Sequence, residues 1–115
     1  AFGLAQGLMA FKGNSRTRFE THKLKVFEAL KNARPTAIDP VNAMVRILGV
    51  IQQETTVDRQ KSAALREAER FADESVEECA AIGRHGAGLI RNGMRLLTHC
   101  NAGWLACVDI GTATA

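Results

Sequence analysis

Apolar residues recur at helical spacing through most of the chain, which predicts a series of amphipathic helices. The expected helices cover residues 1–11, 15–33, 40–53 and 58–91. Asp39 followed by Pro40 is a typical helix start, because the carboxylate can cap free N–H groups and proline suits the first turn. Apolar residues surround most of the helix 40–53, so we expect it to be central and buried. Gly3 and Gly7 share a face of the first helix, which allows another segment to approach closely.

The pattern changes near the end of the sequence. Asn92-Gly93 is a turn signal, residues 94–99 have the pattern of a short buried strand, and residues 103–108 have that of a helix start. A single strand has no partner for its backbone hydrogen bonds, so we expect more sheet outside these residues. The predicted fold class is therefore mainly α, with a strand–turn–helix unit at the end.

Composition narrows the classes of function. The 115 residues are 46% hydrophobic and 23% charged, which is typical of one globular domain. Aromatic residues are 5% with no Tyr, which argues against a surface that stacks nucleic-acid bases. Residues 1–34 carry seven Lys/Arg and two Asp/Glu, a balance of +5 that we interpret as a solvated helix face. No apolar stretch has the roughly 18 residues of a membrane helix.

The cysteines number three, at positions 79, 100 and 107. The odd count and the lack of a CxxC spacing argue against a disulfide framework and against a zinc knuckle. A reducing, cytoplasmic setting fits this usage of cysteine.

Two residues are candidates for a functional site. Cys100 follows the predicted strand and precedes the predicted helix, where ligands bind in open α/β sheets and where a helix N-terminus stabilises a thiolate. The alternative is a buried, inert cysteine. Arg34 is held out of the helical region by Pro35, and its guanidinium suits bidentate phosphate binding. The alternative for Arg34 is an ordinary capping or salt-bridging arginine.

Four motifs, at the spacing found here, resemble the methylthioribose-1-phosphate isomerase family, which is related to the regulatory subunits of translation initiation factor 2B. They are ARPTA (33–37), IGRHG (82–86), LTHCNAG (97–103) and DIGTA (109–113). The resemblance covers nearly the whole chain. The run CNAG within the third motif is its specific part, because it separates the isomerases from the initiation-factor subunits.

The resemblance implies a helical N-terminal domain (residues 1–93) and the start of a Rossmann-like catalytic domain (residues 94–115). It implies a cytoplasmic, homodimeric isomerase of methionine salvage without metal or organic cofactor. The expected reaction converts S-methyl-5-thioribose 1-phosphate into S-methyl-5-thioribulose 1-phosphate. The phosphorylated sugar is the expected partner, and neither nucleic acid nor membrane is expected.

By the same resemblance, Cys100 matches the catalytic cysteine, Arg34 matches a substrate-binding arginine, and the backbone of residues 101–103 (Asn101, Ala102, Gly103) would line the pocket. The phosphate on C1 blocks spontaneous ring opening, so the reaction needs an acid/base group in a water-poor site.

This sequence also departs from the family. Asp39, Trp104 and Cys107 stand where other residues are usual. The family's Arg-Gly-Ala substrate loop and its catalytic aspartate fall outside the sequence, so we expect these 115 residues alone to be inactive. Three alternatives remain: a non-catalytic regulatory subunit like those of initiation factor 2B, a ribose-1,5-bisphosphate isomerase-like enzyme, and a helical interaction module.

Overall fold

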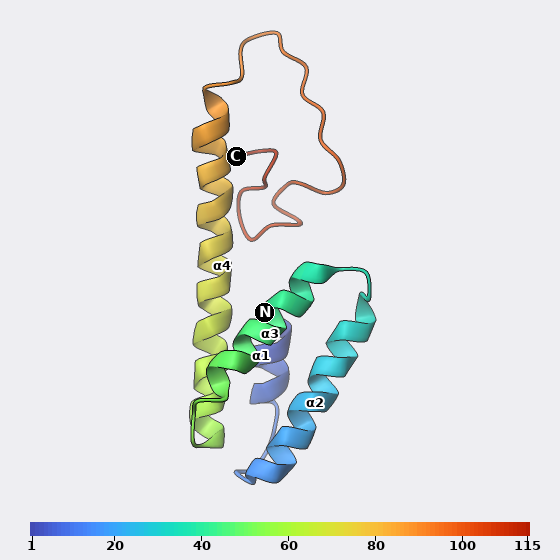
Figure 1. The fold of residues 1–115 in the computed structure, drawn as a ribbon, viewed down its shortest axis with the longest axis vertical. Helices are drawn as coiled ribbons and strands as arrows, with labels where there is room; N and C mark the ends of the chain where they lie inside the picture. Colours follow the sequence, from blue (N-terminus) through green and yellow to red (C-terminus); the bar gives the residue numbers. More distant parts are fainter. The chain divides into compact units, whose positions relative to one another are not determined.

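The computed structural model describes residues 1–115 and contains four α-helices (Figure 1). They are α1 (Phe2–Met9), α2 (Arg16–Ala33), α3 (Ile38–Ile51) and α4 (Val57–Ala87). Residues 88–115 form turns and irregular segments. The chain divides into two compact units, Ala1–Phe71 and Ala72–Ala115, and each is described by itself. These units do not test the predicted domain boundary between residues 93 and 94, which stays a prediction.

The four predicted helices are present, and local signals set several of their ends. Gly13 has a φ of 103°, a left-handed conformation that suits glycine between α1 and α2. Ser15 occupies the N-cap of α2, and its carbonyl accepts a hydrogen bond from the amide of Phe19 at 2.9 Å. Arg34 ends α2 with φ −143° and ψ 73°, outside the helical region, as expected for a residue before proline.

The start of α3 differs from the prediction by two residues. The helix begins at Ile38 with Ala37 as its N-cap, so Asp39 and Pro40 lie within the first turn instead of at its edge. Proline is tolerated there because the first four N–H groups of a helix have no partner within the helix. The carboxylate of Asp39 still faces the positive end of the helix dipole.

The prediction of a wholly buried α3 is wrong. Its buried residues lie on one face, while Val45 on the other side is 55% exposed. The first unit provides packing partners for one face of the helix only. The buried face carries Ala43, Met44, Ile47 and Ile51.

The core of the first unit combines large side chains from α1–α3 with small ones from α4. Its members include Leu4, Leu8, Phe19, Met44, Ile47, Ile51, Val57, Ala63, Ala64 and Ala68. Beside this core, buried Glu67 of α4 pairs with the guanidinium of Arg46 on α3 and with that of Arg70 at 3.0 Å. Two cations thus neutralise a carboxylate that burial alone would destabilise.

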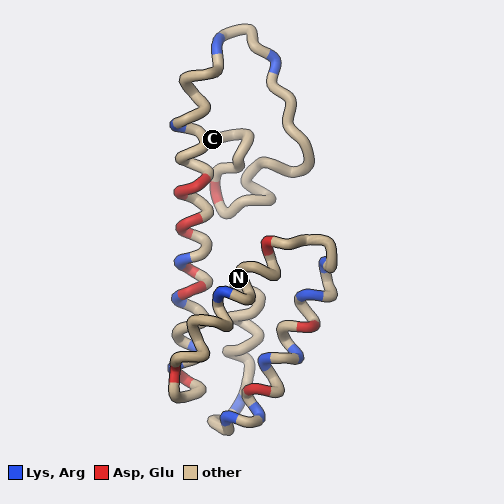
Figure 2. Tube along the Cα trace, in the orientation of Figure 1, with Lys and Arg blue, Asp and Glu red and all other residues tan.

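Basic and acidic residues are interspersed along α2 and α4 (Figure 2). No helix is long and apolar enough to cross a membrane.

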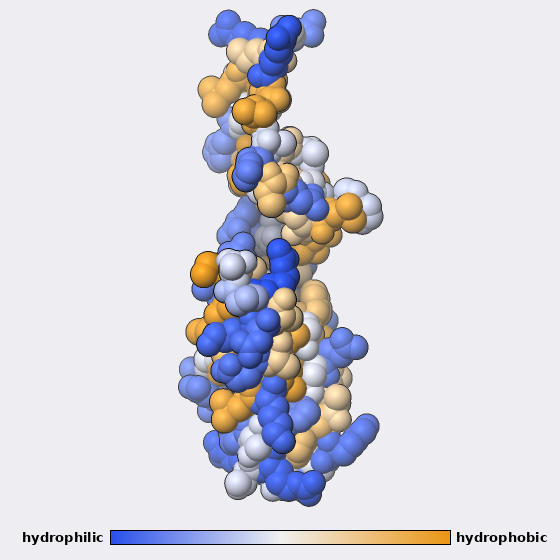
Figure 3. Space-filling model, turned by 90° about the vertical axis from the view of Figure 1, so that its right-hand side faces the viewer, coloured by the Kyte–Doolittle hydropathy of each residue, from blue (hydrophilic) through white to orange (hydrophobic).

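The predicted strand at residues 94–99 and the predicted helix at 103–108 are not formed. Leu97 is 99% exposed, and apolar side chains reach the surface of the chain among polar ones (Figure 3). A strand needs a neighbour to accept and donate its backbone hydrogen bonds, and no second strand is present. Where a helix was predicted, at residues 103–108, only a single turn forms. In this turn the amide of Cys107 donates to the carbonyl of Gly103 at 3.2 Å.

Gly7 of α1 faces α2 closely, in agreement with the predicted approach. A methyl group at Gly7 would lie 2.5 Å from Cγ1 of Val26, whereas nothing lies within 4 Å of such a group at Gly49 in α3. We therefore expect Gly7→Ala to reduce the free energy of unfolding by about 1–3 kcal/mol through overpacking. The matched variant Gly49→Ala should raise it by about 0.5–1 kcal/mol, because alanine favours helix. Urea denaturation of the full-length protein measures both, and equal effects would contradict this packing.

Candidate functional site

Cys100 is exposed and has an uncommon backbone conformation. Its φ of 62° makes it the one residue other than glycine with a positive φ. A left-handed conformation costs a non-glycine residue about 1–3 kcal/mol, and such residues concentrate at functional sites.

The loop that follows Cys100 closes on itself through its backbone. The amide of Ala113 donates to the carbonyl of Ala102 at 3.1 Å, and the amide of Gly103 donates to Oδ1 of Asn101 at 3.4 Å. Gly111 is buried, and a Cβ there would overlap the carbonyl oxygen of Ala102 and the Cα of Gly103. The loop from Asn101 to Ala113 therefore requires glycine at position 111, a requirement that the sequence pattern did not show.

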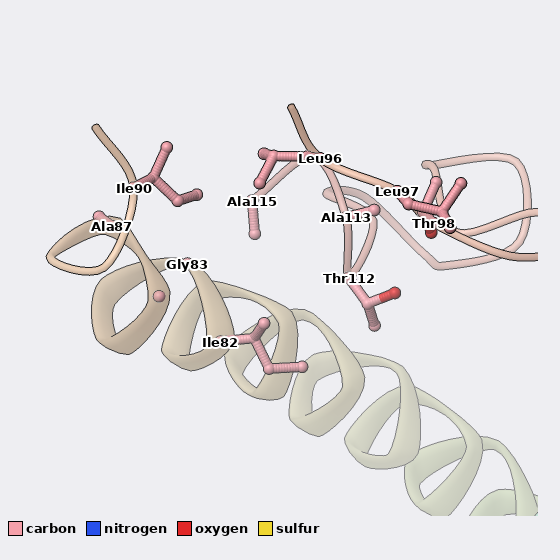
Figure 4. Close-up of a pocket in the computed structure, with 11 residues that line it drawn as sticks. Ile82, Gly83, Ala87, Ile90, Leu96, Leu97, Thr98, Thr112, Ala113 and Ala115 are labelled. Carbon is pink, nitrogen blue, oxygen red and sulfur yellow. The ribbon is translucent and has the colours of Figure 1, made fainter. Parts of the chain in front are cut away.

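A cavity of about 610 Å³ lies in the same unit, between the end of α4 and the segments that return beside it (Figure 4). Its walls are mostly apolar, and the hydroxyl groups of Thr98 and Thr112 are its polar side-chain atoms. The lining residues are Ile82, Gly83, Gly86, Ala87, Ile90, Leu96, Leu97, Thr98, Thr112, Ala113 and Ala115. Cys100 is not among them, so its predicted place in a substrate site stays a prediction.

Arg34 is exposed at the end of α2. Its carbonyl accepts a hydrogen bond from the amide of Ala37 at 3.1 Å, which forms the turn around Pro35. Arg34 belongs to the first unit and Cys100 to the second, so the structure fixes the local conformation of each residue separately.

The other two cysteines, Cys79 and Cys107, also lie in the second unit. Cys79 of α4 is buried and Cys107 is half-buried. Burial raises the pKa of the Cys79 thiol, and the Cys107 thiol and the neighbouring carboxylate of Glu78 raise it further. The sequence pattern did not predict any relation between these two cysteines, because they lie far apart in the chain and lack a recognised spacing. No group of three or more His, Cys, Asp or Glu side chains is arranged to hold a metal ion.

The fold and the loop define a class of protein: a helical domain that leads into a short segment with a cysteine held in a strained turn. The chain belongs to the initiation factor 2 subunit family, whose sequence model matches residues 1–113.

Relatives in this family carry names of enzymes and of a translation factor. The chain is 43% identical to the methylthioribose-1-phosphate isomerase of Desulfosudis oleivorans, over 87% of the chain and 29% of that protein. It is 40% identical to the 5-deoxyribose 1-phosphate isomerase of Petrotoga mobilis, over 100% of the chain and 34% of that protein. The crystal structure of translation initiation factor eIF-2B subunit delta from A. fulgidus matches with a TM-score of 0.80 and 35% identity, over 96% of the chain and 32% of that one.

The chain thus spans about a third of the length of the curated relatives that it matches. The match to the delta subunit confirms the helical part of the predicted fold.

Gly111 offers a test of the closed loop after Cys100. We expect Gly111→Ala to lower the free energy of unfolding by about 1–3 kcal/mol, because the methyl group would collide with backbone and not with a movable side chain. Gly88→Ala is the matched control, since nothing lies within 4 Å of a Cβ at that position. Thermal and urea denaturation of the full-length protein measure the difference. Unchanged stability in Gly111→Ala would show that the loop does not close as described.

Proposed function

We propose that the full-length protein is an aldose–ketose isomerase that converts S-methyl-5-thioribose 1-phosphate into S-methyl-5-thioribulose 1-phosphate in methionine salvage. The observation that carries this proposal is the exposed thiol of Cys100, held at a positive φ inside the motif LTHCNAG. The names of the sugar-phosphate isomerases to which the chain is similar support the reaction class.

In this proposal the second unit continues into a Rossmann-like domain, and the enzyme is a cytoplasmic homodimer. The unpaired segment at residues 94–99 and its exposed apolar side chains support a continuing sheet, because they would gain both hydrogen bonds and burial there. The isomerisation moves hydrogen within one molecule and needs no net oxidant or reductant, and the proposal includes no cofactor.

The reaction sets two demands on the protein. The bond between C1 and the ring oxygen must break while that oxygen takes a proton. The hydrogen on C2 must then end on C1 while the C2 hydroxyl becomes a carbonyl. An acid/base group beside C1 and C2 meets both demands when water is excluded. We assign Cys100 this role, with the backbone of Asn101, Ala102 and Gly103 shaping the pocket around it.

Binding of the phosphate needs a cation with free donors. The exposed guanidinium of Arg34 fits this need, because its planar N–H groups can pair with two phosphate oxygens at once. We therefore assign Arg34 to substrate binding.

A second candidate function follows from the likeness to the initiation factor delta subunit. A regulatory subunit would bind a sugar phosphate or nucleotide without converting it. Purified full-length protein distinguishes the two, because the enzyme turns over S-methyl-5-thioribose 1-phosphate whereas a regulator binds without turnover. The same assay with 5-deoxyribose 1-phosphate and ribose 1,5-bisphosphate tests the alternative isomerase substrates.

Cys100→Ser should lower kcat at least ~100-fold, the scale of a lost acid/base group, because a hydroxyl is a far weaker acid than a thiol. Thermal stability should stay nearly unchanged. Cys79→Ser and Cys107→Ser are the controls and should keep most of the activity under reducing conditions. Near-normal turnover by Cys100→Ser would remove this residue from the proposed mechanism.

Arg34→Ala should weaken substrate binding by about 1.5–3 kcal/mol, the typical contribution of a hydrogen bond to a charged group. Arg34→Lys should recover little, since one ammonium cannot form the bidentate pair. Calorimetric titration of the full-length protein with substrate measures both variants. Unchanged affinity in both would return Arg34 to a structural role at the end of α2.

A further inference from the structure

A basic cavity in the first unit lies at the opposite end of α2 from Arg34. It has a volume of about 290 Å³ and lies between the loop after α1 and the first half of α2. The helical rise of about 1.5 Å per residue separates Arg18 from Arg34 by about 24 Å along the axis. The cavity is lined by Phe11, Arg18, Thr21, His22 and Lys25, so no carboxylate faces it.

The helical repeat explains why two cations share this cavity. Arg18 and Lys25 are seven residues apart, so they lie on one face of α2, about two turns or 10.5 Å from each other along the axis. Thr21 and His22 lie between them on that face. Long, flexible basic side chains at this separation can both reach one phosphate group that lies between them.

Neither of these two cations is neutralised by a carboxylate of the protein. Lys23, on another face of the same helix, pairs with Glu20 at 2.8 Å, whereas no ion pair involves Arg18 or Lys25. Both side chains are exposed. Two like charges at one cavity repel each other, and an anion between them would replace this repulsion by two attractive contacts. The charge of the cavity therefore suits a phosphate group.

The other walls of the cavity are fixed by contacts within the first unit. The ring of Phe11 packs against Phe19 and His22, with 5.2 Å and 5.3 Å between the ring centres. Nε2 of His22 donates to the carbonyl of Gly7 at 2.8 Å, which holds the imidazole in place. Nζ of Lys61 lies 5.6 Å from the centre of the Phe11 ring and adds a third positive charge nearby. A fixed aromatic ring beside cations favours a ligand with carbon atoms next to its phosphate.

We propose that this cavity binds a small organic phosphate monoester, with its phosphate between Arg18 and Lys25 and its carbon skeleton against Phe11. The hydroxyl of Thr21 donates to the carbonyl of Thr17 at 3.3 Å, so its oxygen is still able to accept a hydrogen bond from a hydroxyl of the ligand. The site does not depend on the proposed isomerase activity, because none of its residues belongs to the proposed substrate site.

Chemical labelling of lysines in the full-length protein tests this site. The protein is treated with a limiting amount of an amine-reactive succinimidyl ester in chloride, inorganic phosphate or glycerol 3-phosphate, at constant pH and ionic strength. Mass spectrometry of the digested protein then gives the extent of labelling at each lysine. We expect glycerol 3-phosphate to protect Lys25 at least about fivefold once its concentration exceeds the Kd about fourfold. Lys31, which is exposed on the same helix, should be labelled equally in all three solutions.

Three variants make the result specific. Arg18→Ala should raise the concentration that half-protects Lys25 about fivefold, the scale of one exposed ion pair. Lys31→Ala is the matched control, because it removes the same charge from α2 outside the cavity, and it should leave the protection unchanged. Arg34→Ala should also leave it unchanged, since the substrate phosphate is assigned to the other end of the helix.

Three results would overturn the proposal. The first is equal protection of Lys25 and Lys31, which would indicate screening of charge and not a site. The second is equal protection of Lys25 by inorganic phosphate and glycerol 3-phosphate, which would remove the role of the carbon skeleton. The third is protection that survives in Arg18→Ala or is lost in Arg34→Ala. Because the unmodified sequence provides the main result, a variant that fails to fold does not obscure it.

Discussion

Burial of the short helix α1 holds the first unit together. Its eight residues are too few for a stable isolated helix, so α1 forms because its two leucines are fully buried among α2–α4. Side chains from two other helices also donate hydrogen bonds to carbonyl groups in α1 and in the loop that follows it. Nε2 of His22 donates to the carbonyl of Gly7 at 2.8 Å, and Nζ of Lys61 donates to that of Phe11 at 2.8 Å. Removal of α1 would therefore expose the core and leave the donor of His22 without its partner.

The helices of this unit could be predicted because their apolar spacing is a local property of the sequence. The exact start of α3 could not, because Asp39-Pro40 satisfies the rules for a first turn in more than one register. Burial of α3 was overestimated for a different reason. An apolar residue such as Val45 becomes buried only when another segment covers it, and the sequence pattern does not specify what that segment is.

The predicted strand failed for a similar reason, because its backbone hydrogen bonds also depend on a second segment that the sequence pattern does not specify. Residues 94–99 have a strand-like composition, yet strand structure exists only between paired segments. Helices form their backbone hydrogen bonds internally, so α4 extends through Gly83 and Gly86 without a second segment to pair with its backbone. The local pattern is thus enough to predict the helices of this chain and not enough to predict the part that follows Gly93.

The candidate site combines features that the sequence could and could not reveal. The motif around Cys100 was visible, but its positive φ depends on how the loop folds back. The left-handed conformation of Cys100 costs free energy, which must be offset by the structure that follows it. The backbone hydrogen bond between Ala113 and Ala102 and the close approach at Gly111 supply that offset. The tail motif therefore matters physically to the cysteine, because its glycine permits the packing that holds the strained turn.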